Sequence, residues 1–150
     1  MEQERTCLNG RRLIISDRRS FRDDLAASGA IPRVTLLSAW RAEPGSLIFW
    51  EEIVEDLLED GCTYFVCAGD FAEELHDLVD NLIFRQSRCA TVATTYHNDD
   101  CPSDVINFFV YTTTLEEISN EALLAILEPG LPYDCDLLMS LRNECHLGRR

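Results

Sequence analysis

Lysine is missing from this chain of 150 residues, and all 13 of its strongly basic residues are arginines. A chain without lysine cannot form a lysine Schiff base with a carbonyl substrate, and it has no phosphate-binding lysine of the P-loop kind. The patterns G-x-G-x-x-G, G-x-x-x-x-G-K-[ST] and G-x-S-x-G are also absent. The sequence therefore argues against a standard dinucleotide site, a P-loop nucleotide site and an α/β-hydrolase nucleophile elbow.

Long apolar runs are missing as well. No run of 18 apolar residues occurs, and the N-terminal segment lacks the apolar stretch and small-residue cleavage site of a secretory signal. We therefore expect a cytoplasmic protein without a membrane helix. The seven cysteines include no C-x-x-C pair, which argues against a zinc knuckle or a thioredoxin motif. Their odd number predicts reduced thiols.

Positive charge is scarce, and the net charge is −14. Such a surface repels phosphate backbones and anionic lipids, so we expect no direct binding of nucleic acid and no membrane binding. A basic protein partner is permitted, although high solubility is the plainest interpretation. Six of the arginines lie in the first 30 residues. We expect residues 1–30 to form an Arg-rich arm, or an edge strand plus a helix, before an α/β domain of residues 31–150.

The pattern of apolar residues predicts alternating strands and helices. Strands are expected at 12–16, 34–40, 63–68 and 89–95, and helices after the N-cap residues Ser20, Ser46, Asp70, Ser103 and Thr114, the last continuing through 126. Residues 136–141 are expected to form a last strand or a short helix. This order predicts a single α/β domain with a small, mostly parallel sheet of about three to five strands. Helices flank the sheet in a Rossmann-like or flavodoxin-like layering, and residues 63–97 form its centre.

Sites in open α/β sheets lie beyond the carboxyl ends of the strands. The expected ends carry Trp40, Arg41, Cys67, Asp70, Thr94, Thr95, Tyr96, His97, Asp99 and Asp100. One interpretation is nucleophilic catalysis by a Cys67 thiolate paired with His97 and oriented by a nearby carboxylate, with Asp70 as a further catalytic candidate. Against it, Cys67 lies inside an apolar strand, where a thiol is usually inert.

A second interpretation is a metal site formed by His97, Asp99 and Asp100, with Asp70 as an additional ligand. Imidazole and carboxylate ligands suit Zn, Mn or Fe. However, H-x-D-D is not a specific ligand spacing, and a polar loop before a helix has the same composition.

A third interpretation is a partner-binding surface without chemistry. Trp40, Arg41 and Tyr96 would act as anchors beside Thr94, Thr95 and His97, and Asp99 and Asp100 would form a charged rim. This interpretation requires the least special geometry and no cofactor. The plainest alternative is that Trp40 and Tyr96 only cover the end of the sheet.

Two segments resemble a small bacterial family of unknown function: GCTYFVCAGDFAEELHDLVD at 61–80 and TTYHNDDCPSDVINFF at 94–109. The family carries a G-C-x-Y-F-V-C-x-G strand and turn, an acidic helix with H-D, and a T-T-x-H-x-D segment before a helix ending in F-F. The matching residues are Gly61, Cys62, Tyr64, Phe65, Val66, Cys67, Gly69, His76, Asp77, Thr94, Thr95, His97, Asp99, Phe108 and Phe109. Tyr96 departs from the family, which has tryptophan there. The resemblance draws attention to His97 but implies no activity.

The sequence thus favours a non-enzymatic protein-interaction or regulatory module that docks a protein partner through its acidic surface or its strand ends, and a basic partner is permitted. The alternative is a small hydrolase or metal-dependent enzyme with a site at the strand ends. A homodimer is also permitted, because the edges of a small sheet need cover.

Overall fold

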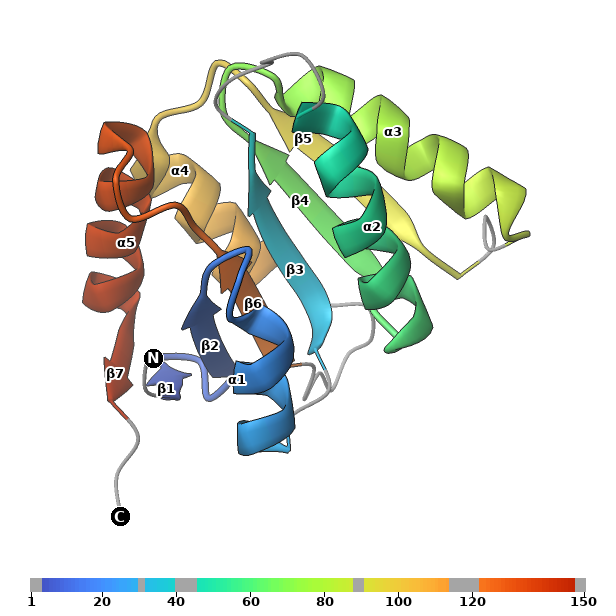
Figure 1. Cartoon of the computed structure of the whole chain (residues 1–150). Helices are drawn as coiled ribbons and strands as arrows, with labels where there is room; N and C mark the ends of the chain where they lie inside the picture. The colour runs from blue at the N-terminus through green and yellow to red at the C-terminus, as the bar shows by residue number, and fades with distance from the viewer. Residues whose placement is uncertain (1–3, 30–31, 40–45, 88–90, 114–121, 148–150) are drawn as a thin grey trace.

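The computed structural model describes residues 4–29, 32–39, 46–87, 91–113 and 122–147. They form one α/β unit around a seven-stranded sheet with the order β5-β4-β3-β6-β2-β1-β7 (Figure 1). The strands are β1 (Arg5–Cys7), β2 (Arg12–Ser16), β3 (Pro32–Ser38), β4 (Tyr64–Ala68), β5 (Ala93–His97), β6 (Ala122–Ile126) and β7 (Cys145–Leu147). The helices are α1 (Phe21–Ser28), α2 (Ser46–Glu59), α3 (Ala72–Arg85), α4 (Pro102–Asn107), its π-helical continuation η1 (Phe108–Thr112), and α5 (Pro132–Glu144).

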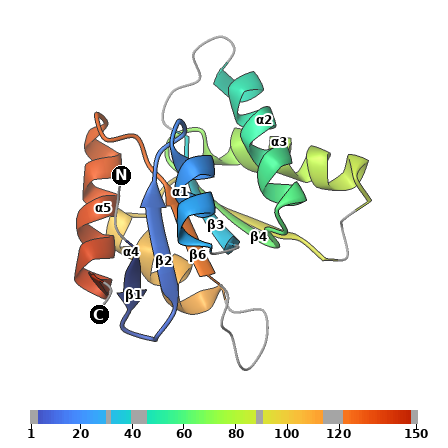
Figure 2. The same cartoon turned by 60° about the horizontal axis from the view of Figure 1, so that its bottom comes forward.

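The sheet is mixed. The five neighbouring strands from β5 to β2 run parallel, whereas β1 is antiparallel to both β2 and β7. Helices α1, α2 and α3 cover one face, and α4, η1 and α5 cover the other (Figures 1 and 2). Right-handed crossovers explain this division. The chain moves from β2 to β5 with its helices on one face, then reverses direction to reach β6 and changes face.

The parallel strands are buried on both sides, and their alternate residues enter two apolar layers. Leu37, Cys67 and Ile126 pack beneath α1–α3, whereas Val66 and Ala125 pack beneath α4 and α5. Strands covered on both faces read as continuous apolar runs, as β4 and β6 do. No described helix is long and apolar enough to cross a membrane.

The predicted α/β class is confirmed, and most of the strand pairs are parallel as expected, but the prediction of three to five strands is wrong, because the described residues form seven. The largest error concerns residues 122–126, which form β6 rather than the end of a helix. All five are apolar and buried, and such a short run carries no period that separates a buried strand from a buried helix. The capping box expected at Thr114 lies outside the described residues. Residues 63–97 are not the centre of the sheet, since β5 is an edge strand.

The Arg-rich segment is part of the sheet. Strand β2 lies between β6 and β1, so the prediction of an edge strand is wrong, although the helix that follows it is confirmed as α1. Residues 136–141 belong to α5, and β7 was not predicted.

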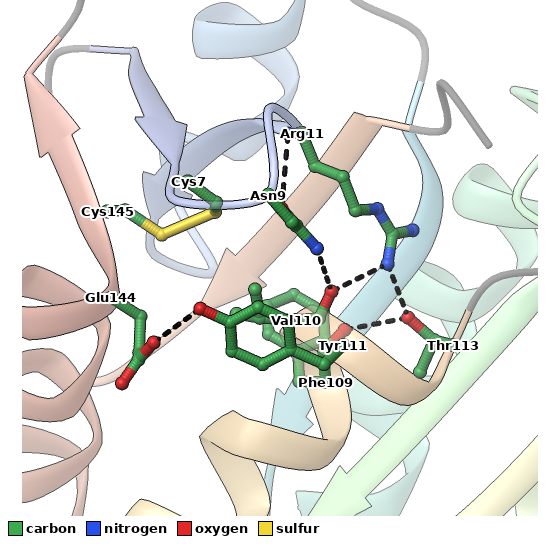
Figure 3. Close-up of a disulfide and its surroundings, with 9 residues drawn as sticks. All are labelled: Cys7, Asn9, Arg11, Phe109, Val110, Tyr111, Thr113, Glu144 and Cys145. Carbon is green, nitrogen blue, oxygen red and sulfur yellow. Dashed lines mark hydrogen bonds between the residues drawn. A yellow bond between two sulfur atoms is a disulfide. The ribbon is translucent and has the colours of Figure 1, made fainter. Parts of the chain in front are cut away.

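A disulfide joins Cys7 on β1 to Cys145 on β7, directly across their ladder (Figure 3). The prediction of reduced thiols is therefore wrong for this pair. Beside it, the buried Arg11 donates from Nη1 to the Val110 carbonyl oxygen and to Thr113 Oγ1, both at 3.0 Å. Asn9 Nδ2 donates to the same carbonyl at 2.9 Å. These bonds tie the β1–β2 turn to the C-terminal end of η1, whose last carbonyls have no partner within the helix.

Candidate functional site

Thr94 and Tyr96 on β5 face helix α3. The Thr94 hydroxyl donates to Asp80 Oδ1 at 2.8 Å, and the Tyr96 ring meets the His76 ring edge-on, with centroids 5.0 Å apart. His76 Nε2 lies 3.5 Å from Asp80 Oδ2. Tyr96 is exposed despite these contacts. It therefore presents an aromatic surface at the rim of the sheet.

His97 faces the opposite side of the sheet, toward α4. Its Nδ1 lies 2.9 Å from Asp100 Oδ2, its Nε2 lies 3.1 Å from Thr95 Oγ1, and its ring lies 4.6 Å from the Phe108 ring between centroids. Both ring nitrogens are thus engaged by near neighbours in the chain. This arrangement orders the turn after β5.

The structure does not bring Cys67 and His97 together. Cys67 pairs with Tyr96 across the ladder and is buried beneath α2 and α3, whereas His97 packs on the α4 side. Burial, reinforced by the charge of Asp80, raises the pKa of the Cys67 thiol far above its ordinary value. A thiol in this state is a poor nucleophile.

Asp70 is exposed and follows Gly69, which has a φ of +99° and lies against the backbone of Ala39. Helix α3 begins beyond Asp70, with Phe71 at its N-cap position and no side-chain capping bond, so the predicted Asp70 cap is wrong.

Of the predicted metal ligands, the structure joins only His97 and Asp100. Asp99 is exposed at the turn. Within the described ranges, no three His, Cys, Asp or Glu side chains are grouped to hold a metal ion. Trp40 and Arg41 lie outside the described residues.

Strand β5 is an open edge, because among the described strands it pairs with β4 alone. Ala93 N–H donates to the Thr63 carbonyl oxygen on the β4 side at 3.0 Å. In a parallel ladder, alternate residues turn their N–H and C=O groups to opposite sides. The N–H and C=O groups of Thr94 and Tyr96 therefore point to the open edge.

Carboxylates lie near this edge: Asp80 on the α3 face, where Thr94 donates to it, and Asp100 on the opposite face beyond the end of the strand, where it contacts His97. Asp77 and Asp80 project from α3, with side-chain exposures of 73% and 52%. Asp99 and Asp100 follow the end of β5, and both are exposed. The edge therefore combines unpaired main-chain groups with negative charge on either side.

Sequence reasoning missed a second location, where β2 and β6 end side by side. A pocket of about 160 Å³ opens there, between the segment that leads into α1 and the segment that leads into α5. Its lining consists of Ile15, Ser16, Asp17, Ser20, Asp24, Leu127, Pro129, Asp134, Cys135 and Leu138. Because the sequence predicts a helix and not a strand at 122–126, no sequence signal places these two segments together.

Two buried Ser–Asp pairs hold the strand ends on either side of β6. Ser16 Oγ donates to Asp24 Oδ2 and Ser38 Oγ donates to Asp134 Oδ1, each at 2.5 Å. The backbone N–H of Glu128 donates to Asp134 Oδ2, also at 2.5 Å. Burial raises the pKa of Asp134, while these hydrogen bonds oppose the rise. Asp134 thus connects β3, the end of β6 and α5.

Comparison with known families gives one match. A domain of unknown function, DUF7684, matches residues 22–130, which is more than half of the chain and includes strands β3 to β6. No curated protein matches the sequence. The resemblance to a family of unknown function is thereby confirmed at the level of the family. The chain belongs to the DUF7684 family, a domain of unknown function.

Proposed function

We propose that the protein is a non-enzymatic protein-interaction module that binds a basic, extended segment of a partner protein along β5. The observation that carries this proposal is the open edge of β5 with carboxylates on both sides. An extended peptide that adds to a sheet edge obtains affinity from main-chain hydrogen bonds and specificity from its alternating side chains. Thr94 and Tyr96 supply the main-chain groups for such an added strand.

The surroundings of the edge favour a basic peptide. Side chains of an added strand alternate between the two faces, so one set meets Asp77 and Asp80 and the other meets Asp99 and Asp100. Exposed ion pairs each contribute only about 0–1 kcal/mol, so their main effect is on selectivity and association rate.

Aromatic surface adds apolar contact beside the edge. His76, Asp80 and Phe84 follow one another at intervals of four residues along α3, so they share one side of the helix. Phe84 is 73% exposed and Tyr96 is 43% exposed. Large aromatic side chains of this kind are common anchors in protein interfaces.

Two alternatives receive less support from the geometry. A hydrolase or metal enzyme would need Cys67, His97 and the carboxylates to converge, and in the structure Cys67 and His97 face opposite sides of the sheet. A homodimer formed edge to edge would place the same carboxylates of two copies against each other, which costs electrostatic energy. A basic partner avoids this cost.

Selection from a library of random peptides about twelve residues long, displayed on phage, tests the proposal, since strand addition needs only a short extended segment. We expect enrichment of peptides in which Arg or Lys alternates with apolar residues. Thr94→Pro removes the amide that points to the open edge and should weaken binding at least tenfold. Thr94→Val is the matched control, because it loses the same hydroxyl but keeps the amide, and it should retain binding.

Circular dichroism of both variants establishes that they are folded before binding is compared. Equal affinity of the two folded variants, or enrichment of acidic peptides, would contradict the proposal. Self-association that Thr94→Pro abolishes would instead assign the edge to a second copy of the chain.

A further inference from the structure

The pocket at the ends of β2 and β6 lies where the direction of the chain across the sheet reverses. Strand β2 leads to α1 on one face, and β6 leads to α5 on the other face. Connections that leave adjacent parallel strands toward opposite faces open a crevice, and open α/β sheets bind ligands in such crevices. The pocket of about 160 Å³ occupies this position.

The walls of the pocket carry negative charge, and a nearby cation, Arg18, pairs with Glu128 and acts on Asp134 from outside the lining. Asp17, Asp24 and Asp134 line it, and none of its described lining residues is Arg or His. The remaining walls are apolar side chains or hydroxyl and thiol groups. A ligand with a positive group and a short hydrocarbon part complements these walls.

Asp24 is the buried carboxylate of the pocket with unused hydrogen-bonding capacity. It is only 6% exposed, and Ser16 donates to its Oδ2. Among the described residues, no donor reaches its Oδ1 and no cation pairs with it. Its Oδ1 is therefore available to a cation bound in the pocket, and charges attract more strongly where exposure to water is low. Asp134 differs, because both of its oxygens already accept hydrogen bonds.

The geometry favours an organic cation over a metal ion. The described carboxylates of the pocket are not grouped around one point as metal ligands are. A primary ammonium group has three N–H donors, and it can satisfy Asp24 while its carbon chain contacts Ile15, Leu127 and Leu138. A volume of about 160 Å³ is well above the ~30 Å³ that one water occupies in the liquid, so the pocket has room for a short alkyl chain with an ammonium group. We infer that this pocket binds a small primary alkylammonium ion through Asp24.

Titration of the isotope-labelled full chain, followed by nuclear magnetic resonance at pH 7, tests this inference. The probe is n-butylammonium chloride, n-butanol is the uncharged match, and sodium chloride is the ionic-strength control. We expect saturable shifts of the Ser16, Ser20 and Cys135 amides with butylammonium, and binding at least tenfold weaker with butanol. Equal binding of the two probes would overturn the inference, as would shifts confined to the exposed carboxylates of α2 and α3.

The variant Asp24→Asn keeps the shape of the side chain and an acceptor for Ser16, but it removes the charge. We expect it to weaken butylammonium binding at least tenfold. Asp23→Asn makes the same change of charge at an exposed position of α1 outside the pocket lining, and it should leave binding unchanged. Equal losses in both variants would overturn the inference in favour of bulk charge. If Asp24→Asn does not fold, the comparison of butylammonium with butanol on the unmodified chain decides.

Discussion

Reduction of the Cys7–Cys145 disulfide should lower the stability of the fold by a large amount. The two cysteines are 138 residues apart in sequence, so the bond closes almost the whole chain into one loop. In the chain-entropy treatment of cross-links, a loop of this length stabilises the folded state by about 5 kcal/mol, because it restricts the unfolded chain. The free energy of unfolding of a domain is commonly only about 5–15 kcal/mol, so this disulfide would supply a substantial part of the stability of the fold.

The assay is urea unfolding of the oxidised and the reduced protein, followed by far-ultraviolet circular dichroism. With a urea dependence of about 2 kcal/mol per molar, a loss of about 5 kcal/mol lowers the unfolding midpoint by about 2.5 M. Cys135→Ser, measured in both redox states, controls for effects of the reductant on an exposed free thiol. Thiol titration must show that the bond is intact in the oxidised sample. Identical midpoints in that sample and in the reduced one would refute the reasoning from chain entropy.

Other residues give predictions of the same kind. Gly69→Ala should lower the free energy of unfolding by at least about 2 kcal/mol, measured in urea, because a Cβ there would lie 2.5 Å from the Ala39 carbonyl oxygen and the backbone of Gly69 has a positive φ. A loss under about 0.5 kcal/mol would contradict this. Asp134→Asn should lower the free energy of unfolding by about 1–3 kcal/mol, since the new amide cannot accept both buried hydrogen bonds. The control Asp136→Asn, at an exposed position of α5, should lower it by less than about 0.5 kcal/mol, and equal losses would argue against the role of Asp134. Brief alkylation of the native protein should label the exposed Cys101 and Cys135 and spare the buried Cys62 and Cys67. Burial raises the pKa of both buried thiols, to about 11 for Cys62. Peptide mass mapping checks this, and rapid labelling of Cys67 would show that β4 is accessible.

The parts of the fold that were predictable have strong local patterns. Helices α2 and α3 each carry a wide apolar stripe with acidic residues on the other side, which only a helix accommodates. Strand β4 was expected at 63–68 and spans Tyr64–Ala68, because its apolar, β-branched and aromatic run ends at a glycine. Strand β5 was expected at 89–95 but spans Ala93–His97, so Tyr96 and His97 lie in the strand and not in the following loop.

The parts that were missed depend on contacts between distant segments. Residues 122–126 are apolar in every position, and only their pairing with β2 and β3 makes them a strand. The pocket depends on that pairing, because it places Ser16 and Asp24 near Asp134, more than 100 residues later in the chain. Local periodicity contains no information about this proximity. The short β1 and β7 are stabilised as a pair by a disulfide, which sequence alone did not suggest.

The two proposed sites use the excess of negative charge in different ways, so their affinities should depend differently on salt concentration. The carboxylates beside β5 are exposed, so about 1 M salt, with a screening length of roughly 3 Å, should weaken basic-peptide binding severalfold. Asp24 is buried in its pocket, and buried charges are screened much less, so butylammonium affinity should change by less than about twofold over the same range. Measuring both affinities at about 0.1 M and 1 M salt checks this difference. A parallel loss at both sites would mean that the net charge of −14 attracts cations without a specific role for either location.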